Sequence, residues 1–161
     1  MKYIFLLLFT INVSSQIQFG QTQDIQTSVS IDPYASYKEK SLNIDLAIEL
    51  INYFHYVKTS AQHFGALKGN YTDLVLTNGI NITYGRFNPI RYYIGVRTGL
   101  VFRNNNTYPL IGFEGGFSLP INKTIAVGLR STYDNRQDMK AYHWPVIWRA
   151  SGFFVLCIKL G

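Results

Sequence analysis

The alternation of side chains across residues 90–103, "IRYYIGVRTGLVFR", constrains the fold of this chain more than any other feature of its sequence. One alternate set is mainly apolar, whereas the other contains three arginines and two glycines. A period of two residues indicates a β-strand with two chemically different faces. The period alone does not say which face contacts water, and both fold and function depend on that choice.

The same period recurs along most of the chain, in segments separated by short turn signals. We expect about eight strands, at 27–37, 41–50, 53–63, 71–85, 90–103, 107–119, 123–134 and 146–161. A tilted strand needs about 9 to 11 residues to cross a membrane, which these segments largely provide. We expect no helix of useful length outside the first residues. Antiparallel strands that no helix covers must form a sandwich or close into a barrel.

The first residues, "MKYIFLLLFTINVSS", predict a signal peptide over 1–15, with a lysine, an apolar run and small residues before the expected cleavage after Ser15. The apolar run is shorter than the roughly 20 residues of a spanning helix. We expect a flexible lead-in over 16–26 and one β-barrel domain over 27–161. Cys157 is the only cysteine, so no disulfide forms within the chain.

The composition of the 161 residues separates this chain from several classes of protein. Charged residues make up 15%, against about 25% in soluble domains, and aromatic residues make up 16%. The chain is nevertheless too polar for a bundle of transmembrane helices. The net charge of +6 comes from basic residues scattered along the sequence, so we expect no nucleic-acid partner.

The glycines indicate that the charged face lies inside a barrel. Most of those within the strands share the face that carries the charges, namely Gly79, Gly85, Gly95, Gly99, Gly112, Gly116 and Gly128. The interior of an eight-stranded barrel is just wide enough for its side chains, so small residues must be mixed with large ones there. On a solvent-exposed face the same glycines would weaken the strands without any gain in packing.

Aromatic residues on the apolar face separate into two groups. Phe102, Tyr133 and Trp148 lie towards one rim, and Tyr84, Tyr92 and Phe117 towards the other. Membrane barrels carry such aromatic girdles where hydrocarbon meets headgroups. The alternative is plain packing of aromatics in a core.

The connections between strands also follow the pattern of membrane barrels. The short ones fall on the side of the termini and the longest, at 135–145, falls on the opposite side, like short periplasmic turns and longer external loops. We therefore expect Arg91, Arg97 and Arg103 to point inward. The residues expected to face lipid are Ile90, Tyr92, Ile94, Val96, Leu100 and Phe102.

Segments such as "YYIGVRTGLVFR", "YPLIGFEGGFSL" and "IAVGLRSTYDNR" resemble the small outer-membrane β-barrel proteins of the OmpA/OmpX type, over essentially the whole mature chain. The resemblance implies an all-β, eight-stranded antiparallel up-and-down transmembrane β-barrel in the bacterial outer membrane. It implies fold and location more than activity. Such barrels usually end in an aromatic residue, whereas this chain ends in Gly161.

The charges expected on the inward face must pair in a narrow lumen, because an unpaired buried charge is very costly. The acidic residues of this set are Asp32, Asp45, Glu49, Asp73 and Glu114, and the basic ones are Lys58, Arg91, Arg97, Arg130, Arg149 and Lys159. We expect a network that closes the lumen, with Glu114 between Arg97 and Arg130. The alternative is a selective pore, which normally needs more strands.

A lipid hydrolase or acyltransferase would need a histidine with a nucleophile or carboxylate near a membrane boundary. His55 and His63 share one strand and His143 stands beside Trp144, but no nucleophile lies at a telling spacing from any of them. Three dispersed histidines and one cysteine match no metal-ligand spacing, so we expect no metal and no cofactor. The sequence predicts a monomeric, lipid-embedded barrel with a structural or surface-interaction role. A lipid-modifying barrel enzyme and a soluble, exported ligand-carrying barrel are the alternatives.

Overall fold

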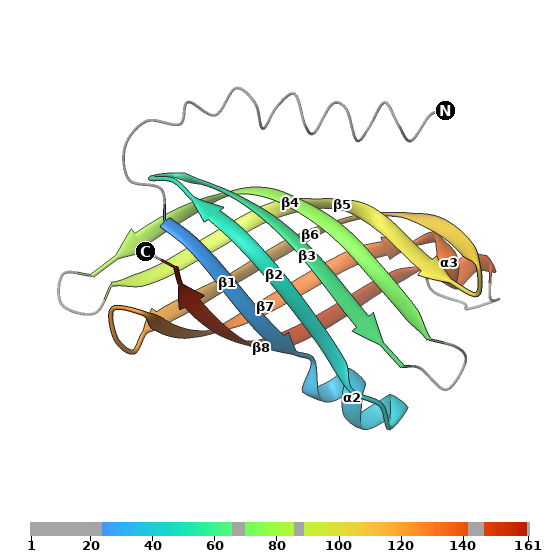
Figure 1. Cartoon of the computed structure of the whole chain (residues 1–161). Coiled ribbons are helices and arrows are strands. Elements are labelled where there is room, and N and C mark those ends of the chain that lie inside the picture. Colours follow the sequence, from blue (N-terminus) through green and yellow to red (C-terminus); the bar gives the residue numbers. More distant parts are fainter. Residues whose placement is uncertain (1–23, 66–69, 86–88, 142–146, 161) are drawn as a thin grey trace.

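The computed structural model of the protein describes residues 24–65, 70–85, 89–141 and 147–160. Within these residues eight strands form a closed barrel, each antiparallel to the next, and β1 pairs with β8 to complete it (Figure 1). The expected eight-stranded up-and-down barrel is therefore confirmed. The expected signal peptide, and the expected lead-in as far as residue 23, lie outside the described residues.

The strands are β1 (Asp24–Ile31), β2 (Asn43–Ile51), β3 (His55–Phe64), β4 (Tyr71–Tyr84), β5 (Ile90–Arg103), β6 (Asn106–Pro120), β7 (Ile125–Arg136) and β8 (Trp148–Lys159). Two short helices lie in connections, α2 (Pro33–Glu39) between β1 and β2 and α3 (Gln137–Ala141) after β7. In the part of the chain that the structure describes, neither helix is long and apolar enough to cross a membrane.

The two ends of the barrel differ in their connections. We call the terminal rim the end where β1 begins and β8 ends, and the distal rim the opposite end, which carries α2 and α3 (Figure 1). At the distal rim β5 and β6 are joined through Asn104 and Asn105, whose φ angles of 48° and 60° are left-handed. Asparagine tolerates this conformation, which is why it favours tight hairpin turns.

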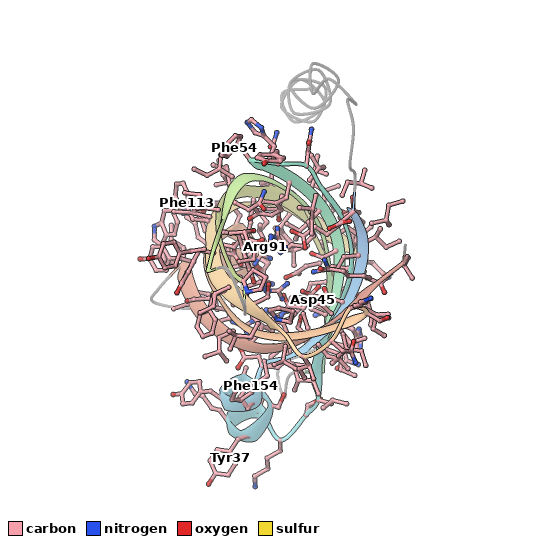
Figure 2. All side chains as sticks on the ribbon, turned by 90° about the vertical axis from the view of Figure 1, so that its left-hand side faces the viewer. Tyr37, Asp45, Phe54, Arg91, Phe113 and Phe154 are labelled. Carbon is pink, nitrogen blue, oxygen red and sulfur yellow. The ribbon has the colours of Figure 1, made fainter. Side chains whose placement is uncertain are left out.

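The barrel carries its apolar side chains outside and its charges inside. Tyr92, Ile94 and Val96 are 48%, 58% and 47% exposed, whereas Arg91 and Arg97 are buried. Figure 2 shows the same division in a view along the barrel, with Asp45 and Arg91 inside the ring of strands and Phe113 and Phe154 outside it. The expected faces of β5 are confirmed. A soluble carrier barrel would have the reverse arrangement, with its aliphatic residues inside.

Residues 27–37 do not form one strand, contrary to the prediction, because β1 ends at Ile31 and α2 begins at Pro33. The Asp32 carboxylate caps this helix by accepting a hydrogen bond of 2.9 Å from the Ala35 N–H, and a proline stands at the first helical position. Both are strong signals for a helix start. We expected no helix of useful length after the first residues, and the two that form, α2 and α3, are short, with 7 and 5 residues.

β1 begins at Asp24, within the stretch expected to be a flexible lead-in. Its first residues belong to the barrel because Gln26 is buried and its side-chain amide donates a 3.2 Å hydrogen bond to Glu49. β1 pairs with β8 only as far as Ile31, which lies opposite Phe154. Residues 148–153 of β8 therefore have no partner on β1, and α2 lies against β8 and β2 at this break in the wall.

Candidate functional site

Ion pairs fill the interior of the barrel from one rim to the other. Nearly all of their side chains are buried, so each charge depends on its partner for stabilisation. The pairs within the described residues are Lys58–Glu114, Arg91–Glu49, Arg97–Asp134, Arg103–Asp138, Arg130–Asp45, Arg136–Asp73 and Arg136–Asp138.

The middle of the lumen is occupied by a cluster around Glu114. Lys58 of β3 reaches across the lumen and hydrogen-bonds to the Glu114 carboxylate, and the Tyr56 hydroxyl donates to the same oxygen at 3.0 Å. The Tyr56 ring meets Tyr93 edge to face, with 5.7 Å between centroids. Glycines make room for these rings, since a Cβ on Gly116 would lie 2.7 Å from the Tyr93 hydroxyl.

Glu114 forms its ion pair with Lys58, whereas the two arginines expected on either side of it, Arg97 and Arg130, pair with other carboxylates. Arg130 hydrogen-bonds to Asp45. The Arg97 Nε atom lies 3.3 Å from Asp134. The strand register explains the difference, because the residues opposite Glu114 on β5 and β7 are Gly95 and Thr132, each two positions from the expected arginine.

Towards the terminal rim, Arg91 forms a two-pronged interaction with Glu49. Its two terminal nitrogens lie 2.6 and 3.1 Å from the two carboxylate oxygens, and its Nε donates to Asn81 at 3.3 Å. This paired geometry is the strongest form of an arginine–carboxylate contact. The guanidinium also lies 5.0 Å from the Tyr93 ring centroid, which connects this cluster to the central one.

Towards the distal rim, Arg136 binds two carboxylates, Asp73 at 2.8 Å and Asp138 at 2.9 Å. Arg103 binds Asp138 from the other side at 3.2 Å. Asp134, Arg136 and Asp138 were not among the predicted interior charges. The alternation offered a signal for the first two, since they continue the inward set that contains Arg130 along β7.

Arg149 lies inside the distal rim, half-buried between two rings. Its guanidinium is 4.9 Å from the Phe64 centroid and 5.7 Å from the Tyr71 centroid, and it donates to the Tyr71 hydroxyl. No carboxylate of the described residues lies within 4.0 Å of it, whereas each of the other arginines that the structure describes has one. Arg149 is thus a cation without an ion-pair partner in this part of the chain.

Lys159 does not belong to the interior network, contrary to the prediction. It lies exposed at the terminal rim, where its Nζ is 3.3 Å from the Asp24 carboxylate. Asp32 is buried, as expected, but it serves as the cap of α2.

The predicted girdle aromatics lie on the outward alternate positions of their strands. Phe102, Tyr133 and Trp148 lie towards the distal rim, and Tyr133 and Trp148 stack with centroids 4.9 Å apart. Tyr84, Tyr92 and Phe117 lie towards the terminal rim, where Tyr92 and Phe117 are 6.3 Å apart. Their role at a membrane interface stays a prediction.

The described histidines, His55 and His63, show little that points to a catalytic or metal-binding role. His55 is exposed, and the Nδ1 of His63 lies 3.1 Å from the Thr72 hydroxyl on the adjacent strand. His143 and Trp144 lie outside the described residues. Within those residues, no group of three or more His, Cys, Asp or Glu side chains is arranged to hold a metal ion.

No protein-family model matches the chain, and no curated protein matches its sequence. Solved structures do match its fold. Neisserial surface protein A is 9% identical, with a TM-score of 0.53, and the match covers 85% of this chain and 95% of that one. The outer membrane enzyme PagL is 9% identical, with a TM-score of 0.53, over 85% of this chain and 99% of that one.

The outer membrane protein Ail of Yersinia pestis, in a phospholipid bilayer nanodisc, is 8% identical with a TM-score of 0.53. That match covers 86% of this chain and 100% of the other. At such low identities these likenesses show the fold alone, which is that of small outer-membrane barrels, as the resemblance in sequence implied.

Proposed function

We propose that this chain is a non-enzymatic, monomeric β-barrel of the bacterial outer membrane with a structural or surface-interaction role, its lumen closed by ion pairs. The observation that carries the proposal is the polarity of the barrel, which is apolar outside and charged inside. Large exposed aliphatic and aromatic residues cover the wall on seven of the eight strands, all except β3, among them Val29, Leu46, Leu74, Ile94, Phe113, Leu129 and Phe154.

An apolar surface of this extent is unfavourable in water, since soluble monomers rarely expose contiguous apolar patches above a few hundred Å². A bilayer accepts it, and a closed barrel leaves no strand edge unpaired in lipid. The short connections at the terminal rim support a periplasmic location for that rim. Export would use the signal peptide expected over 1–15.

The ion pairs support a closed lumen. An eight-stranded barrel has an interior just wide enough for its side chains, and here arginines, tyrosines and carboxylates occupy it from Glu49 near one rim to Asp138 near the other. Any surface interaction would use the distal rim, where Tyr34 and Tyr37 of α2 are 72% and 86% exposed. Figure 2 shows Tyr37 well outside the ring of strands.

A lipid-modifying enzyme is the second candidate, and one contact favours it. His63 and Thr72 lie side by side near the distal rim, as a base and a hydroxyl would in a hydrolase. Among the described residues no carboxylate lies within 4.0 Å of His63 to orient it, which favours the non-enzymatic role. Release of fatty acid from lipid by the parent, and its loss in His63→Ala, would reverse this preference.

The test has two parts. The mature protein should fold to a β-rich circular dichroism spectrum in detergent or liposomes and aggregate in plain buffer, because its outer wall needs an apolar solvent. In a planar bilayer the folded protein should carry no steady ion current. A monodisperse, folded sample in plain buffer would contradict the membrane location, and a sustained open channel would contradict the closed lumen.

A further inference from the structure

A cavity and a groove lie next to each other where α2 contacts β8. The first is a cavity of about 150 Å³ inside the distal rim, whose lining includes Arg149, Phe64 and Tyr71 of the barrel and Tyr34 of α2. The second is a groove of about 530 Å³ on the outer wall, lined almost entirely by apolar atoms of β6, β7 and β8 and, again, by Tyr34.

The groove exists because three adjacent strands present small residues outward at the same height. The register places Gly115 of β6 opposite Ser131 of β7, and Ser131 opposite Gly152 of β8. A Cβ on Gly152 would meet no atom within 4 Å, so nothing fills the space beside it. Phe117 and Phe154 form the walls of the hollow towards the terminal rim.

The cavity and the groove are adjacent across the barrel wall. Ala150 lines the cavity and Gly152, two residues further along β8, lines the groove. This part of β8 has no strand partner on the β1 side, and α2 takes that place. Among the described residues, α2 therefore takes the place of a strand between the inside of the distal rim and its outer wall, and Tyr34 lines both the cavity and the groove.

The cavity holds the Arg149 guanidinium, which has no ion-pair partner among the described residues. Among the described residues its one hydrogen bond goes to the Tyr71 hydroxyl, which leaves most of its donors without a partner there. Three carboxylates also line the cavity, those of Asp32, Glu39 and Asp138. An oxygen of Asp32 is engaged in capping α2, and Asp138 pairs with Arg103 and Arg136. Lys38, Arg103 and Arg136 line the cavity as well, so that four cations face three carboxylates in it.

We infer that the cavity and the groove together bind a membrane lipid with an anionic phosphate headgroup. Its phosphate would lie on Arg149, and an acyl chain would lie in the groove of Gly115, Ser131 and Gly152. Guanidinium groups pair with phosphate through two parallel hydrogen bonds. An acyl chain matches an apolar groove within a wall that faces lipid. The inference rests on the proposed membrane location and adds a specific lipid to it.

Native mass spectrometry of the full mature chain, released from detergent with equal amounts of phosphatidylglycerol and phosphatidylcholine, tests the inference. We expect one phosphatidylglycerol molecule to be retained about tenfold more than phosphatidylcholine, because both carry the phosphate but Arg149 and Lys38 would repel the choline cation of the latter. Arg149→Gln should abolish the preference, and Arg149→Lys should restore part of it. Gly152→Leu, whose Cβ would meet no atom within 4 Å and whose side chain would occupy the groove, should reduce retention of both lipids.

The controls are Lys123→Gln, which removes a cation at the terminal rim, and Ala61→Leu, which enlarges an outward residue away from the groove; neither should change retention. Equal retention of the two lipids by the parent, or an unchanged preference in Arg149→Gln, would overturn the inference. So would full competition by inorganic phosphate, which would show an ion site without a lipid. These failures differ from failure of the proposed function, because every variant is first shown to fold in detergent.

Discussion

Lys58 and Glu114, which lie 56 residues apart in the sequence, bind each other across the interior of the barrel. They belong to β3 and β6, which are not adjacent in the sheet, so their ion pair joins opposite sides of the wall. Both side chains are almost completely buried, at 5% and 0% exposure. Removal of either one leaves a charge that neither solvent nor lipid stabilises.

Glu114→Ala should therefore lower the free energy of unfolding by about 3 to 5 kcal/mol, as expected when one partner of a buried ion pair is lost. Urea unfolding of the liposome-inserted protein, followed by tryptophan fluorescence, measures the change. The matched control is Asp24→Ala, because Asp24 and Lys159 form an exposed pair at the terminal rim. That change should cost less than about 1 kcal/mol.

The double variant Lys58→Met with Glu114→Leu separates loss of the pair from loss of packing. Apolar residues of similar size often replace a buried ion pair without loss of stability, so the double variant should recover most of the stability that Glu114→Ala loses. An unchanged unfolding midpoint in Glu114→Ala would show that water fills the lumen and solvates Lys58.

Val96→Arg tests which face of β5 contacts lipid. Val96 points outward near the middle of the strand, next to the inward-pointing Arg97. An arginine on the lipid face should cost about 2 to 4 kcal/mol at mid-depth. The yield of folded protein in liposomes, read from its heat-dependent gel mobility, measures insertion. Thr124→Arg, in the exposed turn after β6, should insert like the parent, and equal yields of the two variants would invert the assignment of faces.

Gly95→Ala and Gly152→Ala compare the same change on the two sides of the wall. A Cβ on Gly95 would collide with the Tyr56 hydroxyl and approach the Thr77 methyl group at 2.9 Å, whereas a Cβ on Gly152 meets nothing. Overpacking a filled interior should cost about 1 to 3 kcal/mol, and the outward change should stay within about 0.5 kcal/mol. Equal unfolding midpoints for the two variants would show that the interior is loosely packed.

The sequence predicts the strands and their faces well because a period of two is a local property of each strand. The inward arginines and outward aliphatics of β5 could be read from fourteen consecutive residues. α2 was missed although its signals are local too. Asp32 followed by Pro33 is a helix start, but the alternation of β1 was extended through it.

The partners inside the barrel could not be predicted in the same way. Which inward residues meet depends on the register between neighbouring strands and on how far the lumen lets side chains reach across it. The strand register differs by two residues from the expected one on either side of Glu114. Gly95 and Thr132 therefore lie opposite Glu114 in place of Arg97 and Arg130. Lys58 then becomes the partner, from a strand three places away in the barrel. No pattern within a single strand contains that information.

Asp138 links α3 to the barrel, because it accepts hydrogen bonds from both Arg103 and Arg136 although it lies beyond the end of β7. Asp138→Asn removes the charge that holds both guanidinium groups. Arg136 keeps Asp73 as a partner, so the strands should remain paired while the helix loses its main attachment.

Hydrogen exchange followed by mass spectrometry in liposomes should therefore show at least tenfold faster exchange in Asp138→Asn for peptides covering Gln137–Ala141, with β7 still protected. Lys140→Ala changes an exposed residue of the same helix and should leave the rate unchanged. Parent-like exchange in Asp138→Asn would mean that other contacts hold α3. Loss of protection throughout β7 would mean that the aspartate supports the barrel itself rather than the attachment of the helix.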